Sequence, residues 1–112
     1  MAYSFTEAEL AAADKITLGG KTYAIPQMAP RQMRIIIPAM REFPTFSVAQ
    51  LAAEHFDRLV DILHASLSRA YPEMKRDDVE DLPIAIEEWA PAMATIAKAS
   101  GLKARVAASG EG

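Results

Sequence analysis

Apolar and polar residues alternate through residues 14–25, on either side of the pair Gly19-Gly20. Two glycines readily adopt the positive φ angles of a two-residue hairpin turn. Residues that this turn brings opposite each other share a face. One face then collects the apolar residues Ile16, Leu18, Tyr23 and Ile25. The other collects Lys15, Thr17, Thr22 and Ala24. The pattern predicts a β-hairpin that rests on other elements, because an isolated hairpin is marginal in water.

The period changes to that of a helix after Pro26, which has no N–H to donate and ends the second strand. A first helix is predicted from Ala29-Pro30, since proline suits the first helical position. Its inward positions, at helical spacing, are Met33, Ile36, Ile37 and Met40. Its other side carries Arg31, Arg34 and Arg41. Pro38 is predicted to kink or end this helix.

A long central helix is predicted next, from the N-cap Ser47 with Gln50 to about Ala70 or Tyr71, just before Pro72. Its polar side carries Glu54, Asp57, Arg58, Asp61, Ser68 and Arg69. The wide apolar stripe that should face the core comprises Ala52, Phe56, Leu59, Val60, Leu63, Leu67 and Ala70.

The last helix is predicted over about 82–100, with Gly101 as the residue that follows its C-cap. Its apolar residues recur in steps of four and three, a narrow stripe that we name the 82–96 seam. The seam comprises Leu82, Ile86, Trp89, Met93 and Ile96. Pro91 should kink or restart this helix. Before it, Asp77 is predicted to cap a short turn of helix that ends at Asp81.

The ends of the chain carry weaker patterns. Thr6 and Glu9 have the spacing of a capping box, so residues 1–13 are either a short helix or a flexible arm. Residues 102–112 lack periodicity and are predicted to be a flexible tail. The sequence therefore predicts one domain over 14–101, mainly α, with three to four helices and one N-terminal β-hairpin (α+β).

Composition narrows the function classes. The 112 residues are 51% hydrophobic with a net charge of −3 and no cysteine. Weak acidity argues against a nucleic-acid binder, and the lack of cysteine excludes disulfides and thiolate metal sites. The first residues lack the features of a signal peptide, and no apolar run reaches the roughly 20 residues of a membrane span. A cytoplasmic protein that binds no membrane is expected.

Candidate catalytic groups are sparse. His55 and His64 point to opposite sides of one helix, and nothing completes a metal site around Asp57, Asp61 and His64. The acidic segment RDDVEDL lacks the spacing of a calcium loop. Gly19-Gly20, followed by Lys and Thr, lacks the spacing of a phosphate-binding loop. Neither an enzyme nor a cofactor is expected.

Two sets of residues are candidates for binding. Arg31 and Arg34 either contact an anionic partner or form a solvated helix face. Trp89 is either a core anchor or an interface hot spot, and the 82–96 seam suits packing on a second surface. Self-association is predicted through this seam or through the edge of the hairpin.

The order of parts resembles the small tail assembly chaperones of long-tailed bacteriophages and prophages. The resemblance covers about residues 16–101. It comprises the hairpin ITLGGKTYAI, the helix opening APRQMRIIIPAM, the long helix FDRLVDILHASLSRAYPEM, the acidic link RDDVEDLP and the close KASGL. It implies a non-enzymatic role in which the protein binds the tape measure protein and tail-tube subunits, self-associates, and is absent from the mature virion.

Two alternatives remain open from the sequence. One is a structural tail or connector component of the virion. The other is a small helical nucleic-acid-binding regulator that uses Arg31, Arg34 and Arg41.

Overall fold

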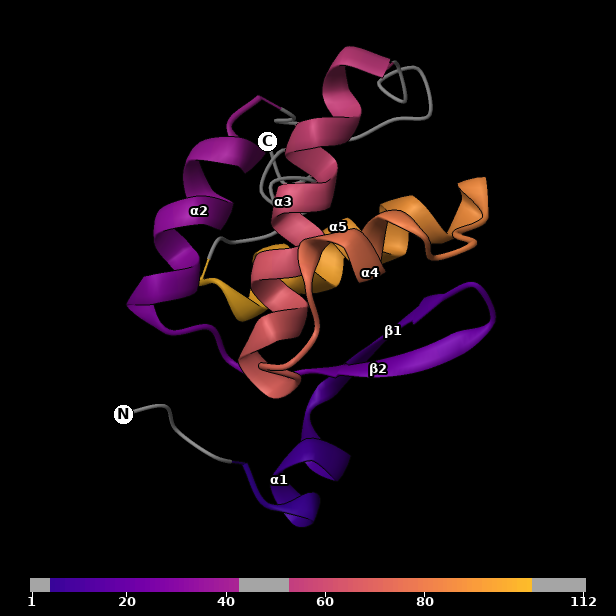
Figure 1. Ribbon diagram of the computed structural model, residues 1–112. Helices are drawn as coiled ribbons and strands as arrows, with labels where there is room; N and C mark the ends of the chain where they lie inside the picture. Colours follow the sequence, from indigo (N-terminus) through magenta and orange to yellow (C-terminus); the bar gives the residue numbers. More distant parts are fainter. Residues whose placement is uncertain (1–4, 43–52, 102–112) are drawn as a thin grey trace, which may run out of the picture.

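The computed structural model describes residues 5–42 and 53–101. Within them the chain forms a mainly helical α+β domain with one antiparallel two-stranded hairpin near the N-terminus, as predicted. Three longer helices carry the core, and two short helices of six and five residues flank them. Figure 1 shows the hairpin beneath the helices, with the first short helix beyond it.

The hairpin has the predicted register. Strand β1 (Asp14–Leu18) pairs with β2 (Lys21–Ile25), and Ile16 lies opposite Tyr23. The four apolar residues of the predicted inner face are buried. Ala24, expected on the solvent side, is only 4% exposed, because helix α1 (Glu7–Ala12) lies against β2.

The start of helix α2 (Pro30–Met40) follows from local chemistry. Ala29 is its N-cap and Pro30 its first residue, as predicted. The helix continues through Pro38 and ends two residues later, at Met40. Ile36 is fully buried, and the polar Gln32 is buried too. The Gln32 side chain reaches back, and its Oε1 accepts the N–H of the N-cap Ala29 at 3.1 Å.

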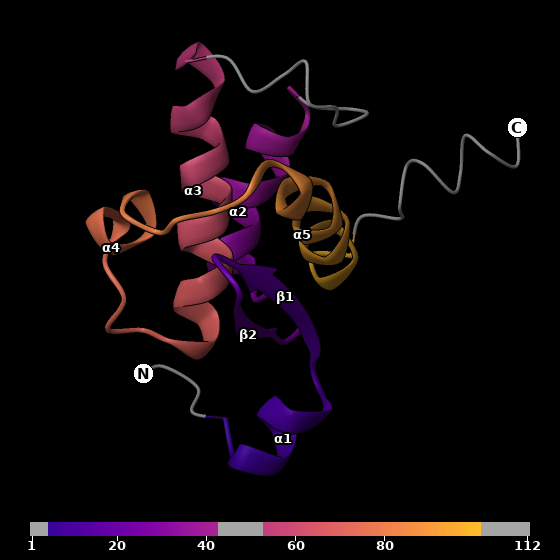
Figure 2. The ribbon, with the colours of Figure 1, turned by 90° about the vertical axis from the view of Figure 1, so that its right-hand side faces the viewer.

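Helix α3 (Ala53–Ala70) is the centre of the domain. Figure 2 shows α4 on one side of it and α5 on the other. It also packs against α2 and β2, so its buried surface is wider than the predicted stripe and includes Ile62, Ala65 and Ser66. Phe56, predicted to face the core, is 38% exposed. The helix ends at Ala70 as predicted, whereas the predicted cap Ser47 lies outside the described residues.

Helix α4 (Arg76–Glu80) starts two residues earlier than expected. Its N-cap is Lys75, and the carboxylate of Asp78 accepts the Lys75 N–H at 2.9 Å. The prediction that Asp77 caps this turn is therefore wrong: Asp77 lies inside the first turn, and the carboxylate that reaches back comes from the next residue.

Helix α5 (Ile86–Ala99) starts four residues later than predicted. Leu82 lies in the link after α4 and is half-buried, so its assignment to the last helix is wrong. The helix passes through Pro91 without a restart. It ends at the C-cap Ser100, followed by Gly101 at φ 81°, as predicted. No described helix is long and apolar enough to span a membrane.

Candidate interaction surface

The histidines and acidic residues singled out in the sequence belong to structural contacts. Nε2 of His64 lies 3.1 Å from the carbonyl oxygen of Met74. Asp57 and Asp61 face the guanidinium of Arg76. Within residues 5–42 and 53–101, no group of three or more histidines and acidic residues could hold a metal ion.

Arg76 ties α4 to α3. Its Nε donates to Asp61 at 2.9 Å, its Nη2 lies 3.5 Å from Asp57, and its Nη1 pairs with Glu80. The hydrogen bond to Asp61 raises the pKa of Arg76, desolvation acts against this, and the charges of Asp61 and Glu80 add to it. The acidic segment 76–83 is therefore partly neutralised from within the chain.

Glu88 fastens the tip of the hairpin to the start of α5. Its carboxylate accepts the N–H of Gly19 at 2.7 Å, of Gly20 at 3.2 Å and of Ala85 at 2.9 Å. Hydrogen bonds from Ala85 and from Gly19 lower the pKa of Glu88, against a smaller effect of desolvation. The backbone N–H groups that a phosphate-binding loop would offer to a ligand are here occupied by a side chain of the same protein.

The 82–96 seam is mostly internal. Trp89 is 5% exposed, its ring meets Phe56 edge-on at 5.8 Å, and Met93 and Ile96 are also buried. Of the alternatives for Trp89, the structure favours the core anchor. Ile86, predicted as part of the same apolar stripe, is instead 59% exposed. Binding by the seam stays a prediction, and Ile86 is the seam residue with the most surface to offer.

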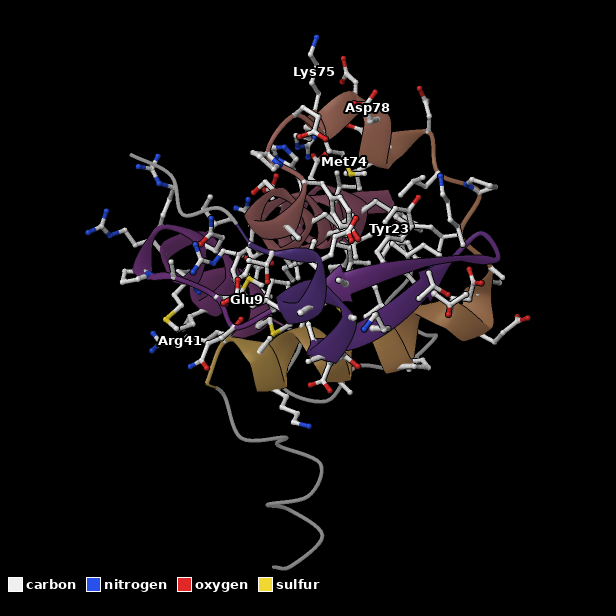
Figure 3. All side chains as sticks on the ribbon, turned by 90° about the horizontal axis from the view of Figure 1, so that it is seen from below. Glu9, Tyr23, Arg41, Met74, Lys75 and Asp78 are labelled. Atoms are coloured by element: carbon white, nitrogen blue, oxygen red, sulfur yellow. The ribbon has the colours of Figure 1, made fainter. Side chains whose placement is uncertain are left out.

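The outer side of α2 is a different kind of surface. Arg31, Arg34 and Arg41 are exposed, and between them lie the exposed Pro38 and Ile35, the latter 47% exposed. At 100° per residue these five positions fall within about a third of the helix circumference. We name these five residues the arginine face. Figure 3 shows Arg41 at the margin of the domain.

The arginines of the described residues divide into two groups. Arg58 donates to Glu42 at 2.9 Å, Arg69 donates to the carbonyl oxygen of Gln27 at 3.1 Å, and Arg76 holds α4. The side chains of the three arginines of the arginine face have no hydrogen bond or ion pair with any described residue.

The sequence pattern found Arg31 and Arg34 but missed the apolar part of this surface. The sequence pattern assigns Ile35 to neither side of α2, although at 100° per residue it falls only 40° from Arg31, on the side of the arginines. Glu88 was also missed, because its partners come from the far end of the chain.

Comparison with known proteins yields no match. No protein-family model matches the chain, and neither a curated protein nor a solved structure does.

Proposed function

We propose that this protein is a non-catalytic assembly chaperone of the phage tail type, which binds the tape measure protein and tail-tube subunits in the host cytoplasm and is absent from the mature virion. The observation that carries the proposal is the order of elements. A hairpin is followed by a helix, a long central helix, an acidic turn and a last helix. This order agrees with the parts on which the sequence resemblance rests.

The surface of the domain supports a binding role. A helical partner that exposes apolar side chains before assembly can be covered by another helix face. The arginine face of α2 is such a face, since neither a described helix nor the hairpin packs on it. Met28 and Met93 are buried, so these two adaptable methionine side chains do not contribute to the proposed surface.

The test is co-expression with the tape measure protein of the same genome. We expect that protein to remain soluble and to elute with the chaperone in size-exclusion chromatography. The variant Leu63→Asp, which places a charge at a fully buried position, should abolish the effect and serves as the control. If the wild-type chain neither changes solubility nor forms a complex, the proposal fails.

Mass spectrometry of purified virions separates the proposal from the alternative of a structural tail or connector component. A chaperone should be absent from the particles. If the protein is present at a fixed copy number, the alternative holds.

A further inference from the structure

We infer that the arginine face of α2 binds an acidic amphipathic helix of a partner protein. The inference rests on the proposed function in one respect, because it takes the partner to be a helical protein. The location and the chemistry of the site come from the side chains of α2 themselves.

The arginine face has the dimensions of a helix-binding site. Arg31 and Arg41 are ten residues apart, which corresponds to about 15 Å along the axis, or nearly three turns. Along the axis the apolar residues Ile35 and Pro38 lie between Arg34 and Arg41; around the helix Pro38 is at the middle of the face and Ile35 at one edge of it. A partner helix with an apolar residue at the centre and carboxylates three or four residues to either side would match this arrangement.

Charge identifies the partner as acidic. Guanidinium groups bind carboxylates in pairs of parallel hydrogen bonds, and Arg58 and Arg76 of the same chain are paired with carboxylates. The three arginines of α2 have no such partner among the described residues. Three like charges on one exposed stripe repel one another, and a line of carboxylates relieves that repulsion.

A second copy of the chain fits this face poorly. The acidic helix α4 is five residues long, about 7 Å, which is half the length of the arginine face. Asp78 and Glu80 are already bound, to Lys75 and Arg76, and Asp57 and Asp61 of α3 are bound to Arg76 as well.

A nucleic acid also fits less well than an acidic helix. The chain carries a net charge of −3, and this charge opposes a duplex, with about one negative charge per 1.7 Å of its axis, more strongly than a helix that carries a few carboxylates. The apolar residues Ile35 and Pro38 lie between Arg34 and Arg41 along the axis, where a nucleic-acid-binding surface would place further cations.

The experiment measures binding of two synthetic helical peptides to the full-length protein by fluorescence anisotropy. The first is an 18-residue alanine-based helix with one central leucine flanked by glutamates at helical spacing. The second has glutamine at each glutamate position. We expect only the acidic peptide to bind, and the variant R31Q/R34Q/R41Q to lose about tenfold in affinity.

The matched control is K21Q/K75Q/K98Q, which removes the same number of charges from exposed lysines on other parts of the fold. It should bind the acidic peptide as the wild type does. Ile35→Ser should weaken binding without any change in net charge, which tests the apolar part of the arginine face.

Three results would overturn the inference. In the first, both triple variants lose affinity equally, so that only total charge matters. In the second, a duplex DNA of random sequence binds the arginine face with a steep salt dependence while the acidic peptide does not. In the third, the arginine variant abolishes self-association in sedimentation, which makes a second copy the occupant.

The experiments distinguish a failure of this inference from a failure of the proposed function. If the tape measure protein forms a complex that R31Q/R34Q/R41Q does not weaken, the inference fails and the chaperone proposal stands. If the acidic peptide binds the face but no complex with the tape measure protein forms, the proposed function fails and the site remains.

Discussion

Gly19 is constrained twice, by its backbone angle and by its neighbour. Its φ of 63° lies in the left-handed region, and a Cβ atom on it would lie 2.9 Å from Cγ of Pro83 and 3.0 Å from the Pro83 carbonyl oxygen. Gly20 has a φ of 80° but open space around the Cβ position. A substitution at Gly20 therefore tests backbone strain alone, whereas one at Gly19 adds a steric clash with Pro83.

We predict that Gly19→Ala destabilises the protein more than Gly20→Ala. Gly20→Ala should cost about 1 kcal/mol from the positive φ alone, and Gly19→Ala should exceed it because Pro83 has to move. Chemical denaturation of both variants at neutral pH measures the difference. Equal losses would show that Pro83 moves away freely.

A second residue-scale prediction concerns Glu88 and pH. The lowered pKa means that the Glu88 carboxylate stabilises the fold at pH values above its unfolded pKa of about 4.3. This contribution disappears as the pH falls through the lower folded value. Glu88→Gln should therefore lower the midpoint of urea unfolding at pH 7, and the difference from the wild type should shrink towards pH 3.

Glu87→Gln is the matched control for this experiment, since it removes the same charge from an exposed neighbour. Its effect should be smaller at pH 7. If both variants behave alike, the hydrogen bonds from the hairpin tip contribute nothing measurable to stability.

At the scale of elements, the hairpin is held by groups from distant helices. Glu88 binds its tip, and the hydroxyl of Tyr71, just after α3, accepts the N–H of Ala24 at 3.0 Å on the outer edge of β2. The rings of Tyr23 and Tyr71 meet edge-on at 5.8 Å. Part of the strand edge that would be open to another chain is thereby covered.

Tyr71→Phe should cost about 1–2 kcal/mol of stability, because the N–H of Ala24 loses its acceptor while the ring contact remains. Tyr23→Phe is the control, since the Tyr23 hydroxyl makes no hydrogen bond with a described residue. Equilibrium denaturation measures the free energy of unfolding of the two variants. A larger loss of stability for Tyr23→Phe than for Tyr71→Phe would contradict the prediction.

Helix α5 combines core and surface in one apolar stripe. Trp89→Ala should cost about 3–5 kcal/mol, because it leaves a cavity against Phe56. Ile86→Ser, at an exposed position, should change stability by less than about 0.5 kcal/mol. Thermal unfolding of both variants measures the contrast, and a similar loss for Ile86→Ser would show that this residue is covered.

At the scale of the whole molecule, charge is unevenly distributed. Arg58, Arg69 and Arg76 hold elements together, and the three arginines whose side chains have no partner among residues 5–42 and 53–101 lie on the arginine face of α2. The acidic turn around α4 lies on another side of α3 (Figure 2).

Self-association remains a prediction at this scale, and the structure narrows its location. Most of the 82–96 seam is buried within the chain, so Ile86 is the residue to test. We expect the sedimentation coefficient to rise with protein concentration and the rise to weaken in Ile86→Ser. A strict monomer at the highest concentration would exclude the seam and the hairpin edge alike.

The sequence by itself determined the features that depend on neighbours along the chain. The register of the hairpin follows from two glycines and an alternation of period two. Proline and glycine sterics placed the start of α2 at Pro30 and the end of α5 before Gly101. Such features depend on backbone angles and short-range hydrogen bonds, which residues close together in the sequence determine.

Only the tertiary structure decided which sides of these elements are covered. The bond from Gly19 to Glu88 joins residues 69 positions apart, so no local pattern reveals it. Ala24 is buried by α1, whereas Ile86 is left exposed. Burial depends on which elements pack together in space. For that reason the sequence could name Arg31 and Arg34 as binding candidates, but only the fold shows that neither the hairpin nor another described helix covers the arginine face.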